Sequence, residues 1–261
     1  MSRVVTLLSD FGTRDGYVAA VKGVLLARCP GATLVDVTHE ISPGDVAAAA
    51  FVLAQATPYF PPGSVHLAVV DPGVGSERRA IACRVAEQLY VAPDNGILTR
   101  VLEGQASARA HQIDHPALRL PSLSQVFHGR DLFAPAAAHL ASGAPLAGVG
   151  PKLANESLAR TAWPEPTLGP DGGEGQVVYV DRFGNLVTNL PVGPEPPRGV
   201  TSVAGRDVPI HRSYSDVAPG SLVALCGSSG LLEVARNRGS AAESLGVGPG
   251  DVVTWRRPPR E

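Results

Sequence analysis

An acid, a turn and an arginine make up the segment with the clearest potential for chemistry. Asp71 ends an apolar run and is followed by a Pro-Gly-Val-Gly turn and then by Arg78 and Arg79. The turn allows the side chains of Asp71 and Arg78 to meet as an ion pair, which could hold a water molecule and stabilise negative charge developing on it. The alternative is a salt bridge that only fixes the loop. Arg79 points elsewhere, so we expect it to be structural or solvent-facing.

Two further polar residues, Asp10 and His128, also lie at the ends of apolar segments. Asp10 comes after an apolar run and precedes Phe11 and Gly12, where the chain must turn. A carboxylate there suits a bidentate hydrogen bond to a vicinal diol such as a ribose, although it could also be a turn or helix-capping acid. His128 precedes an alanine-rich segment, where an imidazole can orient a nucleophile, move a proton near neutral pH or cap a helix. Together with Asp71, these residues predict one active site on an α/β scaffold.

The C-terminal third contains a second group of polar residues in turns. They offer an aromatic ring for stacking, amides for pairing with the edge of a purine, and a Gly-Ser-Ser-Gly turn that exposes backbone N–H groups. Each alone is typical of an ordinary β-turn, but together they resemble a nucleoside pocket. The residues are Asp181, Phe183, Asn185, Ser228, Arg236 and Asn237.

Two other functions compete with a nucleoside-processing enzyme. A metal-dependent phosphoesterase could use Asp10, Asp71, Asp94 and His39 as ligands. However, a hydrogen-bonded turn explains His39 better, and the histidines show no HxH or HExxH spacing, which argues against a metal site. A non-catalytic sensor could bind a nucleoside with the same pocket and never turn it over.

The composition excludes several classes of protein. With 261 residues, 44% of them hydrophobic and a net charge of −2, the chain is globular and lacks the basic surface that nucleic-acid binding requires. Its longest apolar stretch, Val46–Ala56, is too short to span a membrane, and no signal segment precedes the first strand, so we expect a cytoplasmic protein. Cys29, Cys83 and Cys226 are far apart and are expected to be buried apolar residues.

The elements that position these residues alternate along the first half of the chain. Short apolar runs predict strands, and segments with apolar residues at helical spacing predict helices. This alternation predicts an α/β fold with a mainly parallel sheet flanked by helices on both faces. The predicted strands are Val4–Leu8, Leu34–Val37, Val65–Val70, Ala80–Val85 and Leu89–Ala92, and the predicted helices are Gly16–Arg28, Asp45–Ala56, Gly96–Leu102 and Arg130–Leu140.

The pattern changes after about residue 141. Residues 141–175 are dominated by Gly, Pro and polar residues, which predicts a linker. Short strands separated by turns come after it and indicate a smaller antiparallel β-barrel domain. The expected domains are residues 1–160 and 174–261. The predicted barrel strands are Gln176–Val180, Leu186–Leu190, Leu222–Cys226 and Asp251–Trp255.

With these motifs assembled, the chain resembles the S-adenosylmethionine hydroxide adenosyltransferases, relatives of the bacterial fluorinases and chlorinases. The resemblance extends through nearly the whole chain. It implies an N-terminal α/β domain, a C-terminal β-barrel domain and a homotrimer with active sites between subunits. The motifs that carry it are Ser9–Gly12, Asp36–His39, Val70–Gly75, Ala92–Gly96, Phe127–Asp131 and Asp181–Asn185.

The resemblance also assigns roles to residues. It implies that Asp71, Arg78 and His128 hold the water or hydroxide, that Asp10 binds the ribose, and that the second polar group contacts adenine and methionine. The halogenating relatives carry a tyrosine in place of Asp71, and the fluorinase carries a serine in place of Gly129. A carboxylate would repel a halide, so the residues favour water as nucleophile. The implied reaction converts S-adenosylmethionine to adenosine and methionine without a cofactor, a nucleic-acid partner or a membrane.

Overall fold

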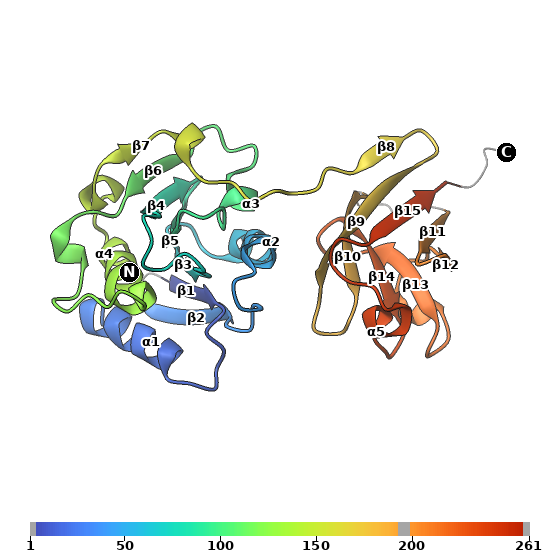
Figure 1. The fold of residues 1–261 in the computed structure, drawn as a ribbon, viewed down its shortest axis with the longest axis horizontal. Helices are drawn as coiled ribbons and strands as arrows, with labels where there is room; N and C mark the ends of the chain where they lie inside the picture. Colours follow the sequence, from blue (N-terminus) through green and yellow to red (C-terminus); the bar gives the residue numbers. More distant parts are fainter. Residues whose placement is uncertain (1–3, 193–198, 258–261) are drawn as a thin grey trace. The chain divides into compact units, whose positions relative to one another are not determined.

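The computed structural model describes residues 4–192 and 199–257, and the chain divides into two compact units (Figure 1). The first unit comprises Met1–Ala162 and the second Trp163–Glu261. Each unit has its own hydrophobic core. The α/β unit and the β-barrel unit can therefore be described independently.

A seven-stranded sheet forms the centre of the first unit, in the order β2-β1-β3-β5-β4-β6-β7. Its strands are β1 (Val4–Ser9), β2 (Thr33–Thr38), β3 (Val65–Val69), β4 (Ala80–Val85), β5 (Gln88–Pro93), β6 (Arg109–Gln112) and β7 (Lys152–Leu153). β2, β1, β3 and β5 run parallel to one another, whereas the pairings β5–β4, β4–β6 and β6–β7 are antiparallel. The predicted α/β class is confirmed, with a mixed sheet.

The antiparallel half of this sheet has a local cause. Only Ala86 and Glu87 connect β4 to β5, and Ala86 adopts a positive φ of 49°. A two-residue connection can make a hairpin but not the crossover that parallel strands need. β7 is a correction to the sequence prediction, because it lies in residues 141–175, which the composition assigned to a linker.

Helices cover both faces of the sheet. α1 (Tyr17–Arg28) and α4 (Ala134–Ala141) contribute to the core on one face, and α2 (Val46–Ala56) and α3 (Thr99–Leu102) to the core on the other. Successive strand residues point to opposite faces. Leu7 accordingly packs in the first core and Leu8 in the second. This layering leaves the carboxyl ends of β1 and β3, where Asp10 and Asp71 follow, at one edge of the sheet.

One predicted helix differs in a way that affects the site. The segment predicted as a helix over Arg130–Leu140 begins instead with a π-helical turn, Gly129–Phe133, and continues as α4. π-Helical turns widen a helix locally and are frequent at functional sites. His128 lies immediately before this turn. Single 3₁₀ turns occur at Thr57–Tyr59, Pro116–Leu118, Leu146–Val149, Asn155–Ser157 and Tyr214–Asp216.

The second unit is a nearly closed antiparallel barrel, as predicted. Its sheet has the order β12-β11-β15-β9-β10-β14-β13, with β8 added beside β9. The strands are β8 (Thr167–Gly169), β9 (Gly172–Val180), β10 (Leu186–Pro191), β11 (Val200–Val203), β12 (Arg206–Pro209), β13 (Leu222–Cys226), β14 (Leu231–Arg236) and β15 (Val252–Arg256), and one short helix, α5, spans Ala241–Leu245. A bridge between Ile210 and Ala224 brings the two ends of the sheet together.

Glycines explain why β9 begins earlier than the sequence predicted. A Cβ at Gly172 would lie 1.9 Å from the carbonyl oxygen of Trp255, and one at Gly175 would lie 2.2 Å from Oδ1 of Asn189. Neighbouring groups approach these two positions so closely that only glycine fits. The glycine-rich sequence therefore belongs to a strand, although its composition is typical of a turn.

The cysteines and helix lengths bear on the class of protein. The three cysteines, all in the described part of the chain, form no disulfide. Cys83 is fully buried as predicted, and burial raises its pKa to about 12. Cys29 and Cys226 are only half-buried, so the prediction of full burial is wrong for them. Within residues 4–192 and 199–257, no helix combines the length and the apolar character that crossing a membrane would need.

Candidate active site

Asp71 and Arg78 meet in a nearly dry, bidentate ion pair. Nε of Arg78 lies 2.9 Å from Oδ1 of Asp71, and Nη2 lies 2.5 Å from Oδ2. The two side chains are only 5% and 10% exposed. The turn between them is closed by backbone bonds from Val74 N to the Asp71 carbonyl and from Ser76 N to the Gly73 carbonyl. The predicted pairing is present, and charge-assisted bonds of this geometry fix both groups in one orientation.

His128 completes the cluster through the same guanidinium. Nη2 of Arg78 lies 2.7 Å from Nδ1 of His128. Because a guanidinium can only donate, Nδ1 must accept, and the neutral ring carries its proton on Nε2. Burial and the charge of Arg78 both hold the pKa of His128 below its ordinary value, although Asp71 opposes them. The ring is therefore a neutral N–H donor at neutral pH.

Aromatic residues pack against Arg78 and around Gly129. The guanidinium carbon of Arg78 lies 5.2 Å from the centre of the Phe133 ring. Phe127 packs edge-on against Phe11 at 5.8 Å, and a Cβ at Gly129 would lie 3.0 Å from the Phe11 ring. Position 129 therefore has no room for a side chain unless Phe11 moves.

Gly75 allows the turn after Asp71 to approach the segment that precedes His128. Its φ is +83°, and a Cβ there would lie 2.9 Å from the carbonyl oxygen of Gln125. We expect Gly75→Ala to lower both the stability and the activity, because alanine adds a left-handed backbone penalty of about 1–2 kcal/mol and also pushes Gln125 away. Gly104→Ala is the matched control, since Gly104 has a φ of +68° and open space around it. Thermal unfolding and turnover of both variants measure the difference; equal turnover would show that the Gln125 contact does not position the site.

Asp10 lies in a loop that a buried hydrogen-bond network holds. Its Oδ2 accepts a bond from Gly44 N at 2.9 Å. On the preceding residue, Oγ of Ser9 lies 2.7 Å from Nδ1 of His39, whose Nε2 lies 3.1 Å from Oδ1 of Asp36. The Asp36 carboxylate also pairs with Lys22 at 2.6 Å. Both ring nitrogens of His39 are thus engaged, and this residue positions the Asp10 loop.

Arg79 and Asp94 form a second ion pair with a structural role. Nε of Arg79 donates to Oδ2 of Asp94 at 2.8 Å, and its Nη2 donates to the carbonyl of Ser157. The other Asp94 oxygen accepts from Ala159 N at 2.9 Å. The pair fastens residues 157–159 to the end of β5, which agrees with the structural role predicted for Arg79.

All six residues of the predicted nucleoside pocket line one cavity of the barrel unit. The cavity has a volume of about 710 Å³, within the range of small-molecule sites. Its walls come from the β9–β10 turn, the β13–β14 turn and the end of β14. The predicted residues that line it are Asp181, Phe183, Asn185, Ser228, Arg236 and Asn237.

Several of these side chains also hold the barrel together. Oδ1 of Asp181 accepts from Asn185 N, and its Oδ2 accepts from Nδ2 of Asn185, both at 2.9 Å. Arg236 donates to the Gly220 carbonyl at 2.9 Å. The Phe183 ring, in contrast, is 76% exposed. An exposed aromatic ring at the mouth of a polar cavity is well suited to stacking on a base.

The same cavity is lined by five further residues that the sequence did not single out, and Glu233 and Tyr214 are the two that form a hydrogen-bonded pair. Glu233 is 7% exposed, and its Oε1 accepts a 2.6 Å hydrogen bond from the hydroxyl of Tyr214. Burial, together with the nearby charge of Asp181, raises the pKa of Glu233 above its ordinary value. An acid within the apolar run of β14 was the available signal, because a buried carboxylate is costly unless it has a partner.

The fold and the sites define a class: an α/β unit with an Asp-Arg-His cluster at the carboxyl end of a parallel strand, followed by a β-barrel unit with a polar cavity. Models of the SAM hydroxide adenosyltransferase N-terminal and C-terminal domains match residues 5–150 and 175–254. The chain belongs to the SAM hydroxide adenosyltransferase family.

Individual relatives support the same assignment. The chain is 48% identical to an (R)-S-adenosyl-L-methionine hydrolase of Thermus thermophilus, covering 96% of this chain and 98% of the relative. It is 44% identical to the protein of that name in Salinispora tropica, over 95% of each chain, and 29% identical to a fluorinase of Actinoplanes, over 96% of each. A crystal structure of an uncharacterized conserved protein from Thermotoga maritima superimposes with a TM-score of 0.90 at 36% identity, covering 97% of this chain and all of that one.

Proposed function

We propose that this protein hydrolyses S-adenosylmethionine to adenosine and methionine. The observation that carries the proposal is the Asp71–Arg78–His128 cluster, which offers an acceptor, a fixed cation and a neutral N–H donor at one place. The relatives named (R)-S-adenosyl-L-methionine hydrolase support the choice of substrate.

The chemistry requires an oriented water molecule more than an acid. The water oxygen forms a bond to C5′ of the ribose while the bond from C5′ to sulfur breaks. The electron pair of the breaking C5′–S bond stays on sulfur. Because the sulfonium leaves as the neutral thioether of methionine, no proton has to be delivered to it. Alignment of water with the breaking bond can contribute up to about 7–11 kcal/mol to catalysis.

The hydrogen bonds within the cluster determine which catalytic role each of its three residues can take. His128 presents Nε2–H, so it can donate to the water oxygen but cannot take a proton from it. Asp71 accepts three hydrogen bonds from Arg78 and keeps one lone pair on Oδ1, so it can accept the proton and pass it to solvent. We therefore assign water orientation to His128, proton acceptance to Asp71, and stabilisation of hydroxide character to Arg78.

The remaining predicted residues are proposed to bind the substrate. Asp10 is proposed to hold the ribose hydroxyls, since only its Oδ2 has a hydrogen bond within the described part of the chain. Phe183 and Asn185 are proposed to contact adenine, and Asp181, Ser228, Arg236 and Asn237 to complete the adenine and methionine contacts.

Glu233 is expected to set the affinity for the positively charged part of the substrate. S-Adenosylmethionine carries an ammonium and a sulfonium, and a buried carboxylate gains most from a cationic ligand because water screens it least. We expect Glu233→Gln to raise KM about tenfold, the effect of one lost charge-assisted bond, while the inhibition constant of adenosine stays unchanged. Tyr214→Phe keeps the carboxylate and is the matched control. A Glu233→Gln enzyme with wild-type KM would show that Glu233 does not contact the substrate.

The geometry gives a metal-dependent phosphoesterase little support. Of its candidate ligands, Asp71 and Asp94 are each paired with an arginine, and both nitrogens of His39 are engaged. Within the described ranges no group of three or more His, Cys, Asp or Glu residues could hold a metal. We propose that the reaction needs no cofactor, and that the protein works in the cytoplasm. Activity that survives treatment with a chelator is the expected result.

Product analysis tests the proposal directly. Purified protein incubated with S-adenosylmethionine should release adenosine and methionine in equal amounts, as measured by chromatography. In ¹⁸O-labelled water the label should appear in the 5′-hydroxyl of adenosine. Tight binding of S-adenosylmethionine without any product would instead identify a sensor and overturn the hydrolase.

We further propose a homotrimer in which the polar cluster of one subunit and the barrel cavity of a neighbour act on the same substrate. This assembly rests on the family resemblance. We expect Asp71→Asn and Glu233→Gln chains, refolded together, to exceed the activity of either variant alone when S-adenosylmethionine is kept well below KM, because random mixing leaves about one quarter of the shared sites with both native halves. Sedimentation analysis gives the number of subunits. Mixed samples no more active than the separate variants would exclude a shared site.

A further inference from the structure

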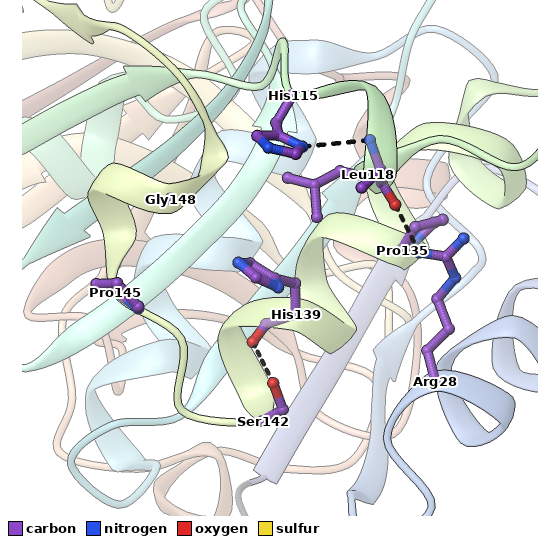
Figure 2. A pocket seen from close by; sticks show the side chains of 9 residues that line it. Arg28, His115, Leu118, Pro135, His139, Ser142, Pro145 and Gly148 are labelled. Carbon is purple, nitrogen blue, oxygen red and sulfur yellow. Dashed lines mark hydrogen bonds between the residues drawn. The ribbon is translucent and has the colours of Figure 1, made fainter.

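A second cavity lies in the first unit and shares no lining residue with the Asp71 cluster (Figure 2). It has a volume of about 450 Å³, which is enough for a small organic molecule. α1, the 3₁₀ turn Pro116–Leu118 and α4 contribute its walls. The lining residues with side chains suited to contact a ligand include Arg28, His115, Leu118, Pro135, His139 and Ser142.

Hydrogen bonds fix two polar side chains of this cavity, Arg28 and His115, as donors. Arg28, at the end of α1, donates from Nη1 to the Ala117 carbonyl at 3.0 Å and from Nη2 to the Arg119 carbonyl at 3.3 Å. These bonds hold the guanidinium at the cavity (Figure 2) and leave further N–H groups. Nδ1 of His115 accepts from Ala117 N at 3.2 Å, so the neutral ring carries its proton on Nε2.

Arg28 gives the cavity a permanent positive charge. Among the described residues, no acidic side chain lines it. Asp114, next to His115, is paired with Arg119 at 3.1 Å. His139 faces the cavity from α4, opposite His115 (Figure 2). Burial and the charge of His115 both hold the pKa of His139 below its ordinary value.

We propose that this cavity binds a small carboxylate with a short apolar chain. Arg28 and His115 supply donors for the carboxylate, His139 lines the same cavity, and Leu118 and Pro135 supply an apolar wall for the chain. A metal ion fits less well, because the guanidinium would repel it and the two imidazoles are its only strong ligands among the residues that line the cavity. This site is independent of the proposed reaction.

Butyrate is the probe for this site, with butylammonium as its cationic counterpart. Titration of the full chain at constant ionic strength, followed by NMR of the imidazole C–H signals, should show saturable shifts of His115 and His139 and none of His211 in the barrel unit. Because a bound carboxylate favours the charged form of His139, saturating butyrate should raise the pKa of His139 above its lowered value in the free chain. Shifts that do not saturate, or that butylammonium reproduces, would overturn the proposal.

Variants separate this site from general charge effects. Arg28→Gln should weaken butyrate binding about tenfold, the value of a charge-assisted bond. His115→Asn should weaken it as well, and it keeps an acceptor for Ala117 N, so the 3₁₀ turn can still form. Arg109→Gln, a change of an exposed arginine on β6, is the matched control and should bind like the native chain. Equal affinities of all three variants and the native chain would contradict the assignment.

Discussion

Asp71→Asn should lower kcat by about 10²–10⁴-fold, the usual contribution of a positioned proton acceptor. Asparagine keeps the shape of the side chain and one oxygen that can accept from Arg78. It has no basic oxygen for the proton of the attacking water, so the loss should fall on kcat, with KM nearly unchanged. Steady-state kinetics with S-adenosylmethionine measure both constants, and circular dichroism checks the fold.

The Arg79–Asp94 pair supplies a control for this variant. Asp94 is as buried as Asp71, with a side chain 4% exposed, and it also pairs with an arginine. Asp94→Asn should therefore reduce stability in a similar way while leaving the turnover of the folded protein intact. If the two variants lost turnover equally, the effect of Asp71→Asn would be structural. A strong loss of turnover in Asp94→Asn alone would instead support the alternative of a metal-dependent phosphoesterase.

Arg78→Ala should have the largest effect on stability as well as removing turnover. It leaves the Asp71 carboxylate, 5% exposed, without its cation, and loss of one partner of a buried pair costs about 3–5 kcal/mol. It also removes the donor that fixes the tautomer of His128. Chemical denaturation measures the free energy of unfolding, and the product assay measures turnover in the protein that remains folded.

A double variant separates these two effects. Asp71→Leu combined with Arg78→Met replaces both charges with apolar side chains, a change that is often neutral or stabilising by about 1–4 kcal/mol for buried pairs. We expect it to recover most of the stability lost in Arg78→Ala and none of the activity. Recovery of turnover in the double variant would show that the charges serve only the fold.

The sequence by itself determined the fold class and the candidate residues. Apolar runs and helical spacing identified β1, β3 and α1 because local periodicity reflects which side chains face the core. The short turn between Asp71 and Arg78 predicted their contact correctly, since the two residues are only seven positions apart and the Pro-Gly-Val-Gly sequence between them favours a turn. Local patterns were sufficient wherever the partners are close in the chain.

Tertiary structure decided what depends on distant partners. Arg78 and His128 are 50 residues apart, and their contact turned an imidazole that could have moved a proton into a neutral donor. Glu233 on β14 and Tyr214 in a 3₁₀ turn are 19 residues apart and meet only at the barrel cavity. Trp255 and Asn189 approach Gly172 and Gly175 so closely that these strand positions accept only glycine. Composition cannot report such contacts, because they arise only when the folded chain brings separate segments within bonding distance.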